Sequence, residues 1–148
     1  MNRLLTATAC LFVLILQGCT LFQQIPFRQA EGYFVLNTLP ATQLTNPKIT
    51  TREEFDRIFG AATTMGKNGM PTSIDFSKEY VIAAVEPETN RAVRMKPRLV
   101  QYEEGNVNLV YLVYLGETQT FSTRPALIVV IPNEHQGPVV LDRIEVNR

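Results

Sequence analysis

The chain has 148 residues, with 14 basic and 14 acidic side chains and a formal net charge of zero. This length fits one ordinary domain that can bury a hydrophobic core. The balanced charge gives no general attraction to polyanions, so no nucleic acid partner is expected.

The amino-terminal segment has the features of a bacterial lipoprotein signal. Arg3 supplies a positive charge, and residues 4–16 form a nearly continuous apolar run, as in a secretory signal peptide. The run is short for a membrane-spanning helix, which needs about 20 apolar residues. Residues 16–19, Leu-Gln-Gly-Cys, resemble a lipobox, in which the cysteine is acylated after cleavage. The alternative is an uncleaved membrane helix.

These features predict a signal peptide over residues 1–18 and lipidation of Cys19, which would anchor the chain in the membrane of a bacterial cell envelope. Thr20 is not the aspartate that retains lipoproteins at an inner membrane, so the outer membrane is favoured where the cell has one. Cleavage would also remove Cys10, the only other cysteine. The mature chain would then have no thiol for cysteine catalysis or for a thiolate metal site.

The domain organisation follows from polarity. Residues 19–31 predict a lipid-anchored tether, because Gln23, Gln24 and Pro26 interrupt any apolar pattern. Residues 32–148 predict a single β-rich globular domain.

One short helix is expected over residues 51–59. Thr51 and Glu54 have the spacing of a capping box, and acidic residues favour the first helical turn. Phe55, Ile58 and Phe59 share one face. The glycine-rich residues 60–72 that follow predict an exposed loop, and such loops often carry function.

The remaining chain predicts successive strands separated by turns and by a polar connection at residues 117–123. Three strands are apolar at successive positions and therefore need cover on both faces. The fold class expected is α+β and β-rich, with mostly antiparallel sheets in a roll or a sandwich. The expected strands are 32–36, 73–76 leading into 80–85, 92–102, 107–115, 126–131 and 139–146; the continuously apolar runs are 80–85, 109–115 and 126–131.

No residue pattern for catalysis, a metal or a cofactor stands out. His135 is the only histidine, and no second imidazole or thiol completes a common metal set. The carboxylates of Glu86, Glu88, Glu103 and Glu104 fall in predicted turns, where solvation is their expected role. We therefore expect no enzyme, no metal and no cofactor.

Two patterns are candidates for binding. Arg94, Lys96 and Arg98 occupy every second position of one strand, so they share a face that could bind a partner; a solvated outer face is the alternative. The opposite side would carry Val93, Met95 and Leu99. Pro97 indicates an edge strand or a bulge.

The second candidate for binding is a set of three tyrosines. They could form a platform for a sugar ring, although packing within the core explains them more simply. They are Tyr102, Tyr111 and Tyr114.

Three segments within residues 49–132 form a recognisable pattern: 51–55 (Thr-Arg-Glu-Glu-Phe), 74–83 (Ile-Asp-Phe-Ser-Lys-Glu-Tyr-Val-Ile-Ala) and 123–132 (Thr-Arg-Pro-Ala-Leu-Ile-Val-Val-Ile-Pro). In order and spacing they resemble the family of C-terminal domains typified by PrcB, a lipoprotein accessory to a bacterial surface protease. The resemblance implies a small β-rich secreted domain that binds or stabilises another envelope protein, and it brings no catalytic residues. In this pattern Asp75 and Lys78 are expected to fix a turn.

The function expected is that of a lipid-anchored, non-enzymatic module that docks on another envelope protein, with a protease as one candidate. Docking would use an exposed strand edge or the 60–72 loop. The alternative is a module that binds an envelope glycan or a small ligand. An unrecognised hydrolase is a third hypothesis, and it would need carboxylates or His135 to converge in a cleft.

Overall fold

The structure is a computed structural model that describes residues 22–38, 44–62 and 67–146. The predicted signal peptide and Cys19 lie outside these residues. No helix within the described ranges is long and apolar enough to cross a membrane.

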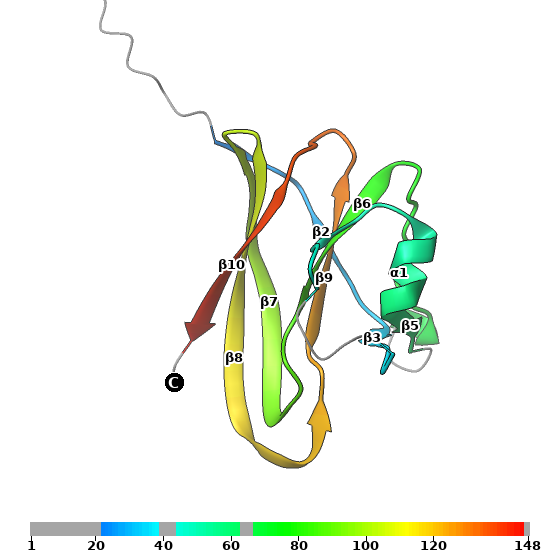
Figure 1. Ribbon diagram of the computed structural model, residues 1–148, viewed down its shortest axis with the longest axis vertical. Helices are drawn as coiled ribbons and strands as arrows, with labels where there is room; N and C mark the ends of the chain where they lie inside the picture. The colour runs from blue at the N-terminus through cyan, green and yellow to red at the C-terminus, as the bar shows by residue number, and fades with distance from the viewer. Residues whose placement is uncertain (1–21, 39–43, 63–66, 147–148) are drawn as a thin grey trace, which may run out of the picture.

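The described residues form two four-stranded sheets and one two-stranded sheet (Figure 1). Sheet A has the strand order β1-β7-β8-β10, sheet B has the order β2-β9-β6-β4, and β3 pairs with β5. The pair β8–β10 is parallel and the other pairs are antiparallel. The elements are β1 (Gln23–Gln24), β2 (Arg28–Ala30), β3 (Tyr33–Val35), β4 (Lys48–Ile49), α1 (Arg52–Ile58), β5 (Phe59–Ala61), η1 (Lys67–Gly69), β6 (Glu79–Val85), β7 (Thr89–Glu103), β8 (Asn106–Thr123), β9 (Ala126–Pro132) and β10 (Val139–Val146).

The predicted fold class is confirmed, since the described chain is β-rich, mostly antiparallel and has one short α-helix. Sheet A packs on one face of sheet B, and α1 covers the other face (Figure 1). β6 and β9 therefore lie in the middle layer and are buried at almost every position. Their continuous apolar runs have the cover on both faces that the sequence predicted.

β8 departs from that prediction. Its residues 107–113 alternate between buried and half-exposed, because none of the described elements covers the outer face of sheet A. Val107, Leu109, Tyr111 and Val113 point into the core between the sheets. The expectation that residues 109–115 would be covered on both faces is therefore wrong.

The helix forms where local signals predicted it. The Thr51 hydroxyl accepts a hydrogen bond from the Glu54 N–H at 3.2 Å, which caps the helix. The Glu54 carboxylate reaches back to the Thr50 N–H at 3.4 Å. Phe55 is fully buried, and its ring packs edge-on against Tyr33 at a centroid distance of 5.0 Å.

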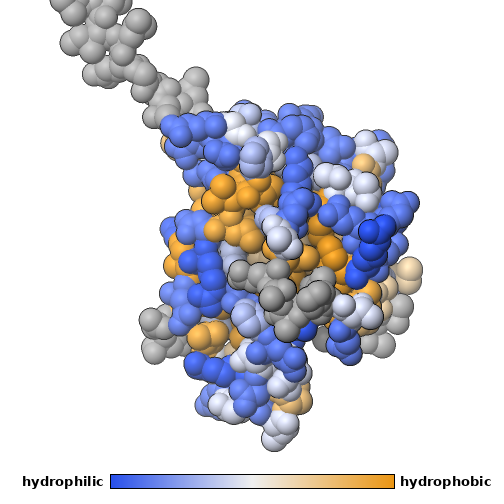
Figure 2. Space-filling view, viewed as in Figure 1, coloured by the Kyte–Doolittle hydropathy of each residue, from blue (hydrophilic) through white to orange (hydrophobic). Residues whose placement is uncertain are grey.

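β7 and β8 form a long hairpin. Their turn uses Glu104 at φ 49° and Gly105 at φ 82°, and two positive φ angles match the turn type that suits the twist of paired strands. At the opposite end, β8 bends and carries the chain across from sheet A to the side of sheet B (Figure 1). Figure 2 shows that the surface of this lower end is mainly hydrophilic, whereas hydrophobic patches reach the surface higher up.

Several boundaries differ from the sequence prediction. Residues 73–76, expected to lead as a strand into 80–85, lie outside any strand. Residues 23–30 of the expected tether form β1 and β2, and Ile25 between them is fully buried between the sheets. The polar segment 117–123 is part of β8 rather than a connection. The expected 60–72 loop begins within β5, which pairs with β3. In each of the last three cases long-range pairing overrides a locally polar or glycine-rich sequence.

Candidate functional site

The basic residues predicted to bind a partner lie on the solvent side of sheet A. The register pairs Arg94 with Tyr114 and Lys96 with Leu112. Both partners on β8 alternate with its buried residues, so their side chains point away from the core. Arg94, Lys96 and Arg98 are all exposed.

Arg98 occupies a β-bulge. Pro97 faces Tyr111 and Leu99 faces Val110, so Arg98 is one extra residue on β7. The bulge shifts the alternation of side chains along the strand. Leu99 therefore shares the solvent side with Val110, and its predicted place on the opposite side is wrong. The bulge that Pro97 indicated is confirmed.

One edge of β7 is open over most of its length. β1 pairs only with Gln101 and Tyr102, and the Ile25 N–H donates to the Val100 carbonyl at 2.8 Å. From Thr89 to Leu99, no described strand pairs with this edge.

The same stretch carries several cations. Among the described residues, no carboxylate lies within ion-pair distance of Arg91, Arg94, Lys96 or Arg98. The open edge of β7 is therefore bordered by positive charge.

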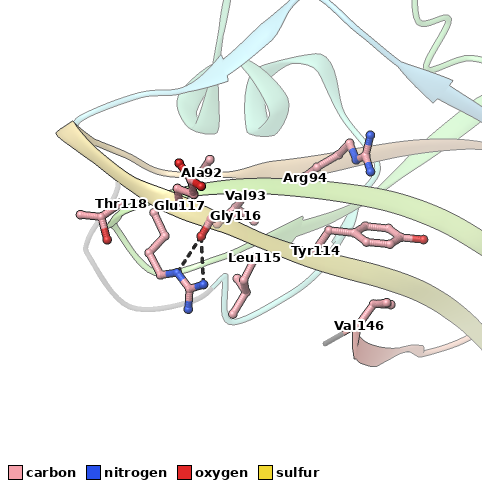
Figure 3. Close-up of a pocket in the computed structure, with 10 residues that line it drawn as sticks. Ala92, Val93, Arg94, Tyr114, Leu115, Gly116, Glu117, Thr118 and Val146 are labelled. Atoms are coloured by element: carbon pink, nitrogen blue, oxygen red, sulfur yellow. Dashed lines mark hydrogen bonds between the residues drawn. The ribbon is translucent and has the colours of Figure 1, made fainter. Parts of the chain in front are cut away.

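A cleft of about 780 Å³ opens between β7, β8 and the end of β10. Arg94 and Tyr114 lie side by side in it, with the guanidinium carbon 5.0 Å from the ring centroid (Figure 3). Val146 lies at the same opening (Figure 3). The cleft is lined by Arg91, Ala92, Val93, Arg94, Tyr114, Leu115, Gly116, Glu117, Thr118 and Val146.

The bend of β8 shapes this cleft. Val93 pairs with Leu115 and Arg91 with Thr118, so β8 carries one extra residue between these pairs. The Arg91 guanidinium donates to the Gly116 carbonyl from Nε at 3.0 Å and from Nη2 at 2.9 Å (Figure 3). A Cβ at Gly116 would lie 3.1 Å from the Ala92 Cβ, so the close approach of the two strands favours glycine there.

The three tyrosines considered for a sugar platform do not come together. Tyr114 lines the cleft on the outer side, whereas Tyr111 is 2% exposed and points into the core. Tyr102 packs against that core, and its ring lies 5.9 Å from the His135 ring. The platform of three tyrosines is therefore wrong.

Sequence reasoning missed a buried ionic cluster. Glu86 is 9% exposed, although a solvated turn was expected for it. Its carboxylate accepts hydrogen bonds from Arg143 Nε at 3.1 and 3.2 Å and from the Tyr111 hydroxyl at 3.3 Å. Arg143 also bonds Glu145 at 3.1 Å. The available signal was the position of Glu86 directly after the apolar strand β6.

The cluster changes the proton affinity of its members. Burial, followed by the nearby Glu86 carboxylate, raises the pKa of Tyr111 to about 12. Hydrogen bonding to Glu86 is the largest cause that raises the pKa of Arg143. Burial alone raises the pKa of Tyr80 to about 12, and its hydroxyl donates to the His135 carbonyl at 2.8 Å.

Because the pKa values of Tyr80 and Tyr111 are raised, we expect the folded domain to lose stability in alkali. A folded-state pKa above the ordinary value of 10.0 adds stability below about pH 10, and this contribution disappears as the pH rises through about 12. Absorbance at 295 nm should show two late ionisations near pH 12. Tyr80→Phe and Tyr111→Phe should each remove one, whereas Tyr114→Phe should leave both. This prediction would be contradicted if all tyrosines ionised near pH 10 while circular dichroism showed that the chain was still folded.

The Asp75 turn has the structural role that was expected. The Asp75 Oδ1 atom accepts from the Ser77 N–H at 3.1 Å and from the Ser77 hydroxyl at 2.6 Å. Lys78 Nζ lies 3.6 Å from its other oxygen. Hydrogen bonding by Ser77 is the main cause that lowers the pKa of Asp75. The turn leads directly into β6.

Within the described residues, no group of three or more His, Cys, Asp or Glu side chains is placed to hold a metal ion. Comparisons of the chain with protein-family models, with curated proteins and with solved structures found no match.

Proposed function

We propose that this chain is a lipid-anchored, non-enzymatic module of the bacterial cell envelope that binds another envelope protein. The lipobox-like residues 16–19 support the anchor. Cys19 and the first strand residue, Gln23, are separated by at most about 14 Å of extended chain. The folded domain would therefore sit close to the membrane that holds its lipid.

The open, basic edge of β7 is the observation that carries the binding role. Unpaired strand edges are avoided or protected in most soluble proteins, because they pair with other chains. This edge has positive side chains beside it, and a β-bulge ends it near Pro97. A partner could use the backbone groups for affinity and the charges for selectivity.

The family resemblance makes an envelope protease the first partner to test. Mild crosslinking of the lipidated chain in its own membranes, followed by mass spectrometry, should recover a reproducible envelope protein. Combining Arg94→Glu, Lys96→Glu and Arg98→Glu should reduce recovery at least about tenfold, because three charges reverse at the contact. Recovery of the domain alone would count against the proposal.

The anchor has its own test. The mature chain should begin at Cys19 and carry acyl mass, and Cys19→Ala should lose that mass. A membrane-bound chain that retains Met1 and carries no lipid would instead support an uncleaved helix.

Binding of a small envelope ligand is the second candidate, and the cleft favours it. Its volume of about 780 Å³ falls within the usual range for small-molecule sites. A screen of envelope glycans by thermal shift would detect such a ligand. Tyr114→Ala should then abolish the shift, and a failure of Tyr114→Ala to do so would place the ligand elsewhere.

A further inference from the structure

The open edge of β7 has a defined length. It begins at Thr89 and is interrupted at Pro97, which has no N–H to donate to a neighbouring strand. The part before Pro97, residues 89–96, spans about 26 Å at about 3.3 Å per residue. Its first residues are irregular, because the Arg91 N–H donates to the Thr89 hydroxyl and the register with β8 shifts at Arg91. The whole part is long enough for one ordinary added strand.

The charges beside this edge have one predominant sign. Arg91 and Arg94 line the cleft, where Glu117 is the one acidic residue of the lining, and Lys96 is exposed further along β7. None of the three cations has a carboxylate within ion-pair distance among the described residues. An occupant with negative charge would complement them.

We infer that β7 accepts an extended acidic segment of the partner protein as an added strand along residues 89–96. The inference rests on the proposed function and specifies the chemistry of its partner. The backbone of the segment pairs with the free edge of β7. Its acidic side chains meet Arg94 and Lys96, which project from the outer face of the same strand.

Two other occupants fit less well. Self-pairing of β7 between two copies would bring two basic strands side by side, which is unfavourable. An anionic lipid surface would use the charges but would leave the backbone edge unpaired. Gln101 pairs with β1, next to the predicted anchor. Arg91 lies about 33 Å from Gln101 along β7, so it is far from the anchored end of the domain.

The test uses the full chain, purified from membranes in detergent, and fluorescent peptides of about eight residues. One peptide alternates glutamate with valine, and a second has lysine in place of glutamate. A third repeats the acidic sequence with an N-methyl group on every residue, so that neither edge can donate hydrogen bonds. We expect the first peptide to bind at least tenfold more tightly than either of the others.

A matched pair of variants locates the contact. Lys96→Glu should weaken binding of the acidic peptide about tenfold, whereas Arg57→Glu reverses a charge on an exposed residue of α1 and should leave binding unchanged. Equal weakening by both variants would overturn the inference, because only the net charge of the chain would then matter.

Three further outcomes would also overturn the inference. Equal binding of the N-methylated peptide would show that no strand is added. Binding to phosphatidylglycerol vesicles but to no peptide would assign the charges to a membrane. If the chain formed dimers at higher concentration and Lys96→Glu disrupted them, the charges would be assigned to contact with a second copy. If crosslinking recovers an envelope partner and Lys96→Glu leaves that recovery unchanged, the inference fails while the proposed function stands.

Discussion

A chain that begins at Gly32 is expected to lose most of its free energy of unfolding, whereas a chain that begins at Thr20 should fold. The shorter chain lacks β2, which pairs with Val130, Val129 and Ile128 of β9. It also lacks Ile25, which fills the core between the sheets. Small domains have only about 5–15 kcal/mol of total stability, so the loss of a central contact and a strand is severe.

Ile25→Ala isolates the core contribution within a full-length domain. Ile25 is fully buried, and replacing a buried isoleucine with alanine costs about 2–5 kcal/mol. Phe22→Ala is the control, because Phe22 is 65% exposed and should change stability by less than about 0.5 kcal/mol. Urea denaturation monitored by circular dichroism measures both. Equal, small effects at the two positions would show that residues 22–31 are a tether after all.

The sequence could not reveal this role of Ile25. The residue is an isolated apolar side chain between two glutamines and Pro26, and a two-residue strand gives no periodic signal. Its burial depends on the pairing of β1 with Gln101 and Tyr102 and on the hydrogen bond from its own N–H to Val100, all distant in the chain. Local polarity therefore predicted a tether.

Local signals did predict the parts of the fold that local interactions determine. Thr51 and Glu54 identified the start of the helix, and Glu104-Gly105 identified the turn of the main hairpin. The strand at residues 139–146 was found, but its parallel pairing with β8 was not. Parallel neighbours are joined through long connections and leave no turn signature.

The candidate site was predictable to a similar degree. The two-residue spacing of Arg94 and Lys96 correctly placed both side chains on the outer side of one strand. The cleft was not predictable, because it depends on a bend of β8 at Gly116 and on the end of a parallel strand. The burial of Glu86 depends on its ion pair with Arg143, which lies 57 residues away in the chain, so local patterns could not reveal it.

The pair of Glu86 and Arg143 should contribute strongly to stability. The Glu86 side chain is 10% exposed, and removing one partner of a buried ion pair leaves an uncompensated charge, at a cost of about 3–5 kcal/mol. Arg143→Met should lower the free energy of unfolding by about 3 kcal/mol, near the lower limit of that range, because Arg143 is 34% exposed. Glu145→Gln is the control, since its exposed ion pair with Arg143 should contribute less than about 1 kcal/mol.

The double variant separates a pair interaction from simple loss of packing. Glu86→Leu combined with Arg143→Met removes both charges and should be more stable than Arg143→Met alone, because apolar replacement of a whole buried pair is often neutral. The positive charge of Arg143 partly offsets the rise in the pKa of Tyr111, so Arg143→Met should shift ionisation of that phenol to higher pH. Additive losses in urea denaturation, with unchanged titration of Tyr111, would show that Glu86 and Arg143 act independently. Coupled losses would mean that this pair fixes β10 across the core to the end of β6.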